Sequence, residues 1–249
     1  MKQALAAGGW SSGVIIPVAD EQLVEVCARS GFGHIFIDCE HGHMSVRECE
    51  TLVRAAENVG TTAIVRVPIN HHDVILRHLD TGSQGVVIPQ VITADDAERA
   101  VRAAYYYPLG ERGLAGTRAA NFGLDGSLSD YTRYANEQLS VFGLIENVRA
   151  IDNLPQLLKV EGLTGITIGP ADLSQSLGVP GQRNHPKVEE AITEIISQAL
   201  AAGVPVGLNT SNGQEAAAAL ERGVRIFSVS AWGLLAGSIR TYLSALPAA

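Results

Sequence analysis

The sequence alternates short apolar runs with amphipathic stretches of helical spacing, and no linker interrupts this alternation. The apolar runs predict buried strands and the amphipathic stretches predict helices. Strands that alternate with helices form parallel sheets, and eight such units at this length predict a closed (β/α)8 barrel, an α/β fold. We therefore assign residues 1–249 to a single barrel domain. The predicted strands are residues 13–16, 34–38, 62–67, 85–89, 140–146, 165–168, 204–209 and 224–230.

An open, doubly wound sheet is the main alternative to the barrel. Such a sheet would need a glycine-rich phosphate loop after its first strand. Here Gly13 precedes that strand and Pro17 follows it, and the sequence contains no GxGxxG motif. The pattern therefore favours the closed barrel.

Composition excludes several classes of partner. The net charge of −8 argues against nucleic-acid binding, which needs a basic surface. No apolar run is long enough to span a membrane, and the N-terminal residues lack the apolar core of a signal peptide. The 3 cysteines are too few and too irregularly spaced for a disulfide framework or a metal cluster. We expect a cytoplasmic protein with reduced thiols.

Barrel enzymes carry their chemistry at the carboxyl ends of the strands. Several polar residues follow predicted strands directly and are expected to face one rim of the barrel. They are Asp38, Glu40, His41, Arg66, Gln90, Glu146, Asp172 and Asn209.

Two acids of this rim set suggest a metal site. Glu146 ends the apolar run VFGLIE, and Asp172 follows the strand in ITIGPADLS. Two carboxylates suit a hard divalent cation such as Mg2+ or Mn2+, which also accepts water and substrate oxygens as ligands. The alternative is that both acids only cap helices.

The remaining rim residues suggest a substrate and a base. Arg66 lies within the apolar IVRVP run, so it needs an anion, either a neighbouring acid or a ligand. Beside a metal, it could stabilise an enolate oxygen. His41 follows Asp38 closely, an arrangement that suits a general base, although an ordinary loop histidine is the alternative.

The GPAD motif offers backbone donors. Pro170 at a helix start would leave the amides of Ala171 and Asp172 free to hold a carboxylate, and Gly169 would let the ligand approach closely. A simple turn is the alternative. None of the lysines, Lys2, Lys159 and Lys187, ends a strand, which argues against a Schiff-base aldolase.

Together these segments resemble a known family. The segments IDCEHGHMS, VRVP, GVVIPQV, YYPLGERGLAG and LIENVRAIDNLPQLLKVEGLTGITIGPADLSQSLG are similar, in order, to the HpcH/HpaI metal-dependent pyruvate aldolases. The resemblance implies a phosphoenolpyruvate/pyruvate-type barrel, a homohexamer (trimer of dimers) that exchanges its C-terminal helix, and a role in aromatic compound catabolism. The implied cofactor is a divalent cation, Mg2+ or Mn2+, with Co2+ or Zn2+ as further candidates.

The resemblance also assigns roles to residues. It implies Glu146 and Asp172 as metal ligands, Arg66 as the enolate-stabilising arginine, and His41 with Asp38 as the base pair. It places the carboxylate of pyruvate on amides around Gly169, Ala171 and Asp172. The implied reaction adds a pyruvate or hydroxypyruvate enolate to an aldehyde, or reverses that addition. The loop with Arg112 and Arg118 could enclose the aldehyde.

This sequence departs from the better-known aldolases at two places. Leu144 stands where they have Gln, and the EHGHM loop, with His43, replaces a common Ala-Pro. Leu144 removes a polar contact near the substrate, which affects the expected acceptor preference and the efficiency with pyruvate itself. The alternatives are a 2-oxo-acid decarboxylase or a thioester-cleaving lyase on the same barrel, and a non-catalytic barrel that binds a 2-oxo acid.

Overall fold

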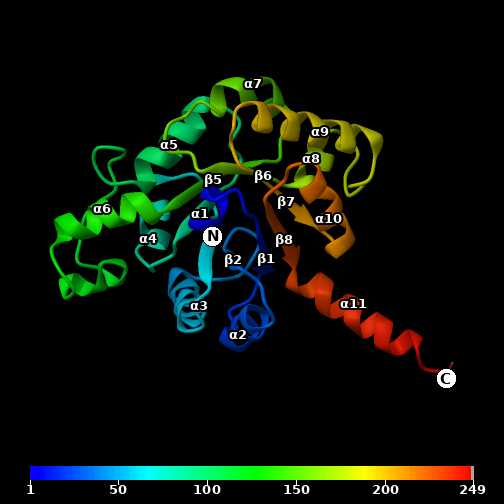
Figure 1. Cartoon of the computed structure of the whole chain (residues 1–249), viewed down its shortest axis with the longest axis horizontal. Coiled ribbons are helices and arrows are strands. Elements are labelled where there is room, and N and C mark those ends of the chain that lie inside the picture. The colour runs from blue at the N-terminus through cyan, green and yellow to red at the C-terminus, as the bar shows by residue number, and fades with distance from the viewer. Residues whose placement is uncertain (248–249) are drawn as a thin grey trace.

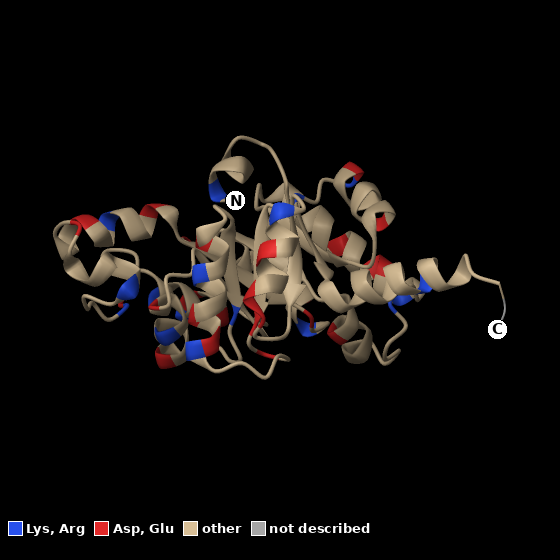
Figure 2. Cartoon of the chain, turned by 90° about the horizontal axis from the view of Figure 1, so that it is seen from below, with Lys and Arg blue, Asp and Glu red and all other residues tan. Residues whose placement is uncertain are grey.

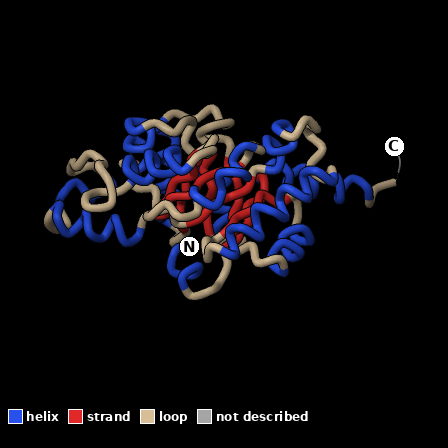
Figure 3. Tube along the Cα trace, turned by 90° about the horizontal axis from the view of Figure 1, so that it is seen from above, coloured by secondary structure: helices blue, strands red, loops and turns tan. Residues whose placement is uncertain are grey.

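Eight parallel strands form a closed barrel, with each strand paired to its neighbours in sequence and β8 paired to β1. The computed structural model describes residues 1–247. In Figure 3 the strands form the centre and the helices surround them. The predicted fold class is therefore confirmed. The strands are β1 Ser11–Ile16, β2 His34–Asp38, β3 Thr62–Arg66, β4 Gly85–Ile88, β5 Ser140–Ile145, β6 Gly165–Ile168, β7 Val206–Thr210 and β8 Ile226–Ser230.

Helices follow the strands in the order expected for this barrel (Figure 1). Two of the helices begin with a capping box, which Ser45 forms with Glu48 and Thr93 forms with Asp96. The helices are α1 Lys2–Ala6, α2 Glu21–Arg29, α3 Val46–Asn58, α4 His72–Leu79, α5 Ala94–Ala104, α6 Leu128–Gln138, α7 Arg149–Leu157, α8 Pro170–Ser176, α9 Pro186–Ala201, α10 Gly213–Glu221 and α11 Ala231–Ser244, with a 3-10 segment, η1, at Arg118–Gly123.

Three local features complete the fold. The segment after β6 forms a short helix, α8, which agrees with the helix start expected at Pro170, because proline at the first position already has a helical φ. The long connection between α5 and α6 contains η1. The last helix, α11, begins at Ala231, and the side chain of Ser230 caps it.

The barrel interior is apolar at its middle and polar at its amino end. Large side chains from several strands fill the middle: Phe36, Ile64, Val87, Phe142, Leu144 and Ile226. Below them, buried His34 contacts Ser11 Oγ through Nδ1 at 2.8 Å and Ser228 Oγ through Nε2 at 3.3 Å. Gly13 leaves room for this ring, since a Cβ there would lie 2.1 Å from His34 Nε2.

The last helix, α11, extends away from the barrel (Figure 1). Only Ala231 at its start is buried. Figure 2 shows that charged residues are sparse along it. Its exposed large apolar side chains are Trp232, Leu234, Leu235, Ile239, Tyr242 and Leu243. Within residues 1–247, no helix is both long and apolar enough to cross a membrane.

Candidate active site

Arg66 and Asp38 form a buried ion pair at the carboxyl ends of β3 and β2. Arg66 Nε donates to Asp38 Oδ1 at 3.0 Å and Nη2 donates to Oδ2 at 2.6 Å. The register that pairs Asp38 with Arg66 across the two strands brings these side chains together. Arg66 thus has the neighbouring acid that its buried position requires.

The loop after β2 folds back over this ion pair. The main-chain N–H groups of Glu40 and His41 both donate to Asp38 Oδ1, at 3.1 and 3.2 Å. Glu40 Oε2 lies 3.1 Å from Arg66 Nη1 and is buried without a well-aligned hydrogen bond. The Asp38 carboxylate therefore contacts His41 through the main-chain N–H of that residue. The side chain that donates to this carboxylate is that of Arg66. The imidazole belongs to an exposed residue beside the rim.

Glu146, directly after β5, is buried and held by Gln90 from the loop after β4. The main-chain N–H and the side-chain amide of Gln90 donate to Glu146 Oε1 at 2.8 and 2.9 Å. Gln90 adopts the left-handed region, with φ at 53°, which is costly for a residue with a side chain. The strained loop aims both donors at one carboxylate oxygen.

Asp172 approaches the same carboxylate from α8. Ile145 pairs with Ile168, so Gly169 is level with Glu146 on the next strand. A Cβ on Gly169 would lie 3.3 Å from Glu146 Oε2, and so glycine keeps the space beside this oxygen open. Within α8 the first intrahelical bond is donated by Leu173 to the Gly169 carbonyl, which leaves the amides of Ala171 and Asp172 free of helical partners.

The electrostatics show that these groups lie in one cluster. Burial raises the pKa of Glu146 to about 7, and the nearby charges of Glu40 and Asp172 add to this effect. Burial also raises the pKa of Glu40. Burial alone would raise the pKa of Asp38, but the hydrogen bonds and charge of Arg66 outweigh it and lower that pKa. Four acids, Asp38, Glu40, Glu146 and Asp172, thus share this cluster with one arginine, Arg66.

This donor set fits a hard divalent cation. Gln90 occupies Oε1 of Glu146 and leaves Oε2 toward the space at Gly169, with the charge of Asp172 nearby. Among residues 1–247, no three His, Cys, Asp or Glu side chains converge closely enough to enclose an ion by themselves. Mg2+ and similar ions are usually held by one or two carboxylates, with water and substrate oxygens completing the shell.

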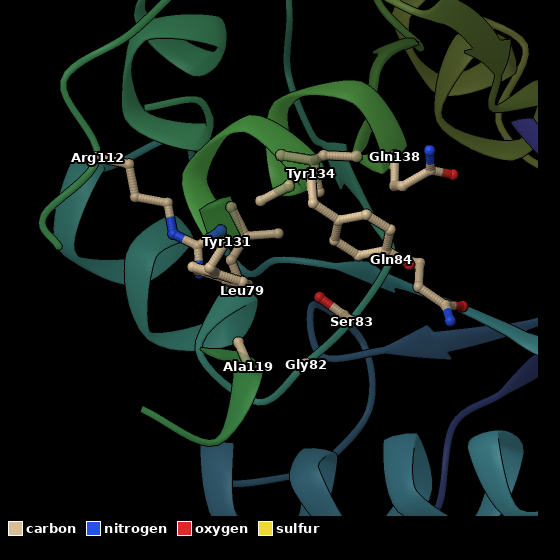
Figure 4. A pocket seen from close by; sticks show the side chains of 11 residues that line it. Leu79, Gly82, Ser83, Gln84, Arg112, Ala119, Tyr131, Tyr134 and Gln138 are labelled. Atoms are coloured by element: carbon tan, nitrogen blue, oxygen red, sulfur yellow. The ribbon is translucent and has the colours of Figure 1, made fainter. Parts of the chain in front are cut away.

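The two loop arginines lie away from this rim, contrary to the expectation that they enclose the aldehyde. Arg112 pairs with Asp80 after α4, and Arg118 pairs with Glu57 near the end of α3. Segments that follow a helix and precede a strand lie at the amino ends of the strands. Arg112 instead lines a small hollow with Tyr131 and Tyr134 (Figure 4), which none of the predicted site residues lines.

Comparisons with known proteins agree with this geometry. The model of the HpcH/HpaI aldolase/citrate lyase family matches residues 11–235. The chain belongs to the HpcH/HpaI aldolase/citrate lyase family. It is 37% identical over 228 residues to a 4-hydroxy-2-oxo-heptane-1,7-dioate aldolase of Shigella flexneri, covering 92% of this chain and 85% of that protein. It is 38% identical over 216 residues to a 4-hydroxy-2-oxovalerate aldolase of Rhodococcus jostii (strain RHA1), covering 84% and 80%.

Solved structures give the same assignment. An HpcH/HpaI aldolase from Desulfitobacterium hafniense DCB-2 superposes with a TM-score of 0.92 at 31% identity, covering 99% of this chain and 97% of that one. The protein is thus an enzyme of a metal-dependent aldolase family, a carbon–carbon lyase. In this HpcH/HpaI site, Gln90 and Glu40 were expected at the rim but without a role, because residue spacing does not reveal a side-chain contact between strands.

Proposed function

We propose that this HpcH/HpaI enzyme makes or cleaves 4-hydroxy-2-oxo acids, joining the enolate of pyruvate or hydroxypyruvate to an aldehyde. The observation that carries the proposal is the meeting of Glu146, Asp172 and Arg66 at one rim, with space kept open by Gly169. A 2-oxo acid is small, anionic and able to chelate, which suits that combination. The alternative lyase and decarboxylase reactions have no feature of this site in their favour.

We assign Glu146 and Asp172 as the residues that would hold the divalent cation. When bound, the cation would supply positive charge that polarises the 2-oxo acid and stabilises its enolate. Mg2+ or Mn2+ suits the two carboxylates best, and Co2+ or Zn2+ are further candidates. Gln90 would keep Glu146 in place, because second-shell donors commonly orient metal ligands.

We assign Arg66 to the developing negative charge on the substrate. A guanidinium has five N–H donors. Two of them donate to Asp38, and Glu40 lies beside the third nitrogen, Nη1. The donors left over can reach an oxygen in the barrel mouth. Asp38 is then a positioning residue, which holds the guanidinium flat and charged.

We assign His41 as the group that removes or returns the proton at the carbon next to the keto group. It belongs to the loop that Asp38 ties down through two main-chain bonds. An exposed imidazole in such an ordered loop can accept a proton and release it to solvent. The amides around Gly169, Ala171 and Asp172 would bind the substrate carboxylate.

The test is exchange of the pyruvate methyl protons in D2O, followed by NMR, with and without Mn2+. We expect exchange that needs added metal and is lost in Glu146→Gln and Asp172→Asn, while circular dichroism shows both variants folded. Thr210→Val, a buried change on β7, serves as the matched control and should retain exchange. Full exchange in the wild type with excess chelator would sink the metal assignment.

Assembly and location complete the proposal. We propose a homohexamer, a trimer of dimers, in which each subunit is a single barrel domain. The subunits exchange α11. The apolar, projecting α11 supports an exchanged helix, since isolated exposure of this many large apolar side chains is unfavourable. A cytoplasmic location and a role in aromatic compound catabolism stay predictions; the buried, free thiols of Cys27, Cys39 and Cys49 agree with a reducing compartment.

A further inference from the structure

Asn209, at the carboxyl end of β7, belongs to the same row of residues as Glu146. Ile145 on β5 pairs with Ile168 on β6, and Ile168 pairs with Leu208 on β7. One residue further along each strand, Glu146, Gly169 and Asn209 therefore lie level with one another. Adjacent strands are about 4.8 Å apart, so the backbones at the two ends of this row are roughly 10 Å apart.

The side chain of Asn209 faces the inside of the barrel. Side chains alternate along a strand, so Asn209 faces the same way as Gly207. A Cβ at Gly207 would lie 3.2 Å from Ile226 Cβ, and Ile226 belongs to the apolar cluster of the interior. Ser228, the register partner of Asn209 on β8, also points inward, where it contacts His34.

Gly169, in the middle of the row, carries no side chain. Glu146 and Asn209 therefore belong to one inward-facing row with no side chain between them. Leu144, whose Cδ1 would lie 3.4 Å from a Cβ at Gly169, contributes only apolar surface there. On the inner face of the barrel, β7 thus supplies a polar side chain, Asn209, whereas β5 supplies the apolar Leu144.

The amide of Asn209 has an unused acceptor. Its Oδ1 is buried and has no hydrogen-bond partner among residues 1–247. Buried polar atoms are nearly always paired, so an orphan at a candidate site points to a ligand that pairs with it. The strand end that carries it is held firmly, because Arg183 Nη2 donates to the Asn209 carbonyl at 2.6 Å.

We propose that Asn209 is a specificity-determining residue, whose amide oxygen accepts a hydrogen bond from a hydroxyl next to the carbonyl of a substrate. This inference rests on the proposed aldolase function and names its substrate class. The hydroxyl can belong to the donor, as in hydroxypyruvate, or to the acceptor, as in an α-hydroxyaldehyde. Both sources offer the same group, a hydroxyl on the carbon next to the carbonyl.

The test compares substrates that differ only by hydroxyl against methyl. One arm sets hydroxypyruvate against 2-oxobutanoate, each with propanal. The other sets glycolaldehyde against propanal, each with pyruvate. The wild type should prefer the hydroxylated member in one arm. In Asn209→Leu, which keeps the branched shape of the side chain and removes the acceptor, the ratio of kcat/KM values in that arm should fall roughly 10- to 100-fold.

Two further variants make the result decisive. Thr210→Val, one residue along and on the other face of β7, should leave both ratios as in the wild type. If Asn209→Leu does not fold, Asn209→Ala gives the same comparison. A change of less than about fivefold in both arms, the lower limit for losing one buried hydrogen bond, would overturn the role of Asn209.

Failure of the proposed function has a different signature. If the wild type exchanges no methyl protons of any 2-oxo acid with any divalent metal, the aldolase proposal falls, and the role of Asn209 falls with it. If exchange and addition proceed but the ratios do not respond to Asn209→Leu, only the role of Asn209 falls.

Discussion

Gln90 donates to a single oxygen of Glu146 twice, through its main-chain N–H at 2.8 Å and its side-chain amide at 2.9 Å. Both bonds depend on a left-handed backbone at Gln90, with φ at 53°. Strained conformations of this kind persist where the surrounding structure holds them, often at functional sites. Here the strain serves to fix the orientation of a buried carboxylate.

This relationship predicts the effect of Gln90→Gly. The variant keeps the main-chain bond and loses the side-chain bond, and we expect Mn2+ affinity to fall about 10-fold, as for other second-shell losses. Stability should stay within about 1 kcal/mol, because relief of backbone strain offsets the lost bond and the flexibility of glycine. Calorimetry of Mn2+ binding and chemical denaturation check both. Unchanged affinity with clearly reduced stability would show that Gln90 only supports the fold.

The ion pair of Asp38 with Arg66 predicts a large stability cost. Asp38→Asn leaves the buried guanidinium with Glu40 as its remaining ion-pair partner. Breaking a buried pair in this way typically costs about 3–5 kcal/mol. Urea denaturation of the variant and the wild type at pH 7 measures the difference. Glu50→Gln, which breaks an exposed pair with Arg54, is the control and should cost under about 1 kcal/mol. Equal losses of stability in Asp38→Asn and Glu50→Gln would show that the buried pair stabilises the fold no more than the exposed pair does.

The proton role of His41 predicts a rate effect without a binding effect. His41→Ala should slow exchange of the pyruvate methyl protons about 100- to 10,000-fold, which is the usual contribution of a general base. Binding of pyruvate, measured by calorimetry with Mn2+ present, should change little. His43→Ala, in the same loop, is the control. Comparable exchange rates in His41→Ala and the wild type would assign the proton to another group.

His34 predicts a dependence of stability on pH. Burial lowers its pKa from 6.5 to about 3, and the charge of the Met1 amino group adds to this. Between these two pH values, the unfolded chain therefore binds a proton at His34 and the folded chain does not. This contribution is complete above pH 6.5 and is lost as pH falls toward 3, by about 1.4 kcal/mol per pH unit.

Denaturation curves at pH 7, 6 and 5 test this expectation. Other groups also titrate over this range, so the informative quantity is the difference between the wild type and His34→Gln. The variant should show a shallower loss of stability between pH 6 and 5. Parallel curves would mean that the buried ring is not what couples folding to pH here.

The apolar surface of α11 predicts disassembly when charge is added. Leu235→Arg combined with Leu243→Arg, at residues that are 52% and 56% exposed, should leave the barrel folded and reduce the particle mass seen by light scattering. Charge in the centre of an apolar interface is costly because it loses its hydration. Thr241→Ser is the control on the same helix. An unchanged mass would exclude α11 from the assembly.

The amino-acid sequence was enough to predict the fold class, the order of the elements and the residues at the rim. It could do so because burial of parallel strands imposes apolar runs, and helices impose their own period on the residues between them. Asp38, Arg66, Glu146 and Asp172 were found because each follows or ends such a run, and strand ends of a barrel share one mouth. The start of the helix at Pro170–Ser176 was predicted from its proline, but its length was not, because its pattern is too short to be periodic.

Which rim residues touch one another depends on the folded chain as a whole. The strand register pairs Asp38 with Arg66, rather than with the imidazole of His41, and brings Gln90 to Glu146. It also sends Arg112 and Arg118 to the amino end of the barrel and sets Asn209 level with Glu146 across Gly169. These contacts join residues far apart in the chain. They depend on register, backbone conformation and packing, which local patterns of hydrophobicity do not record.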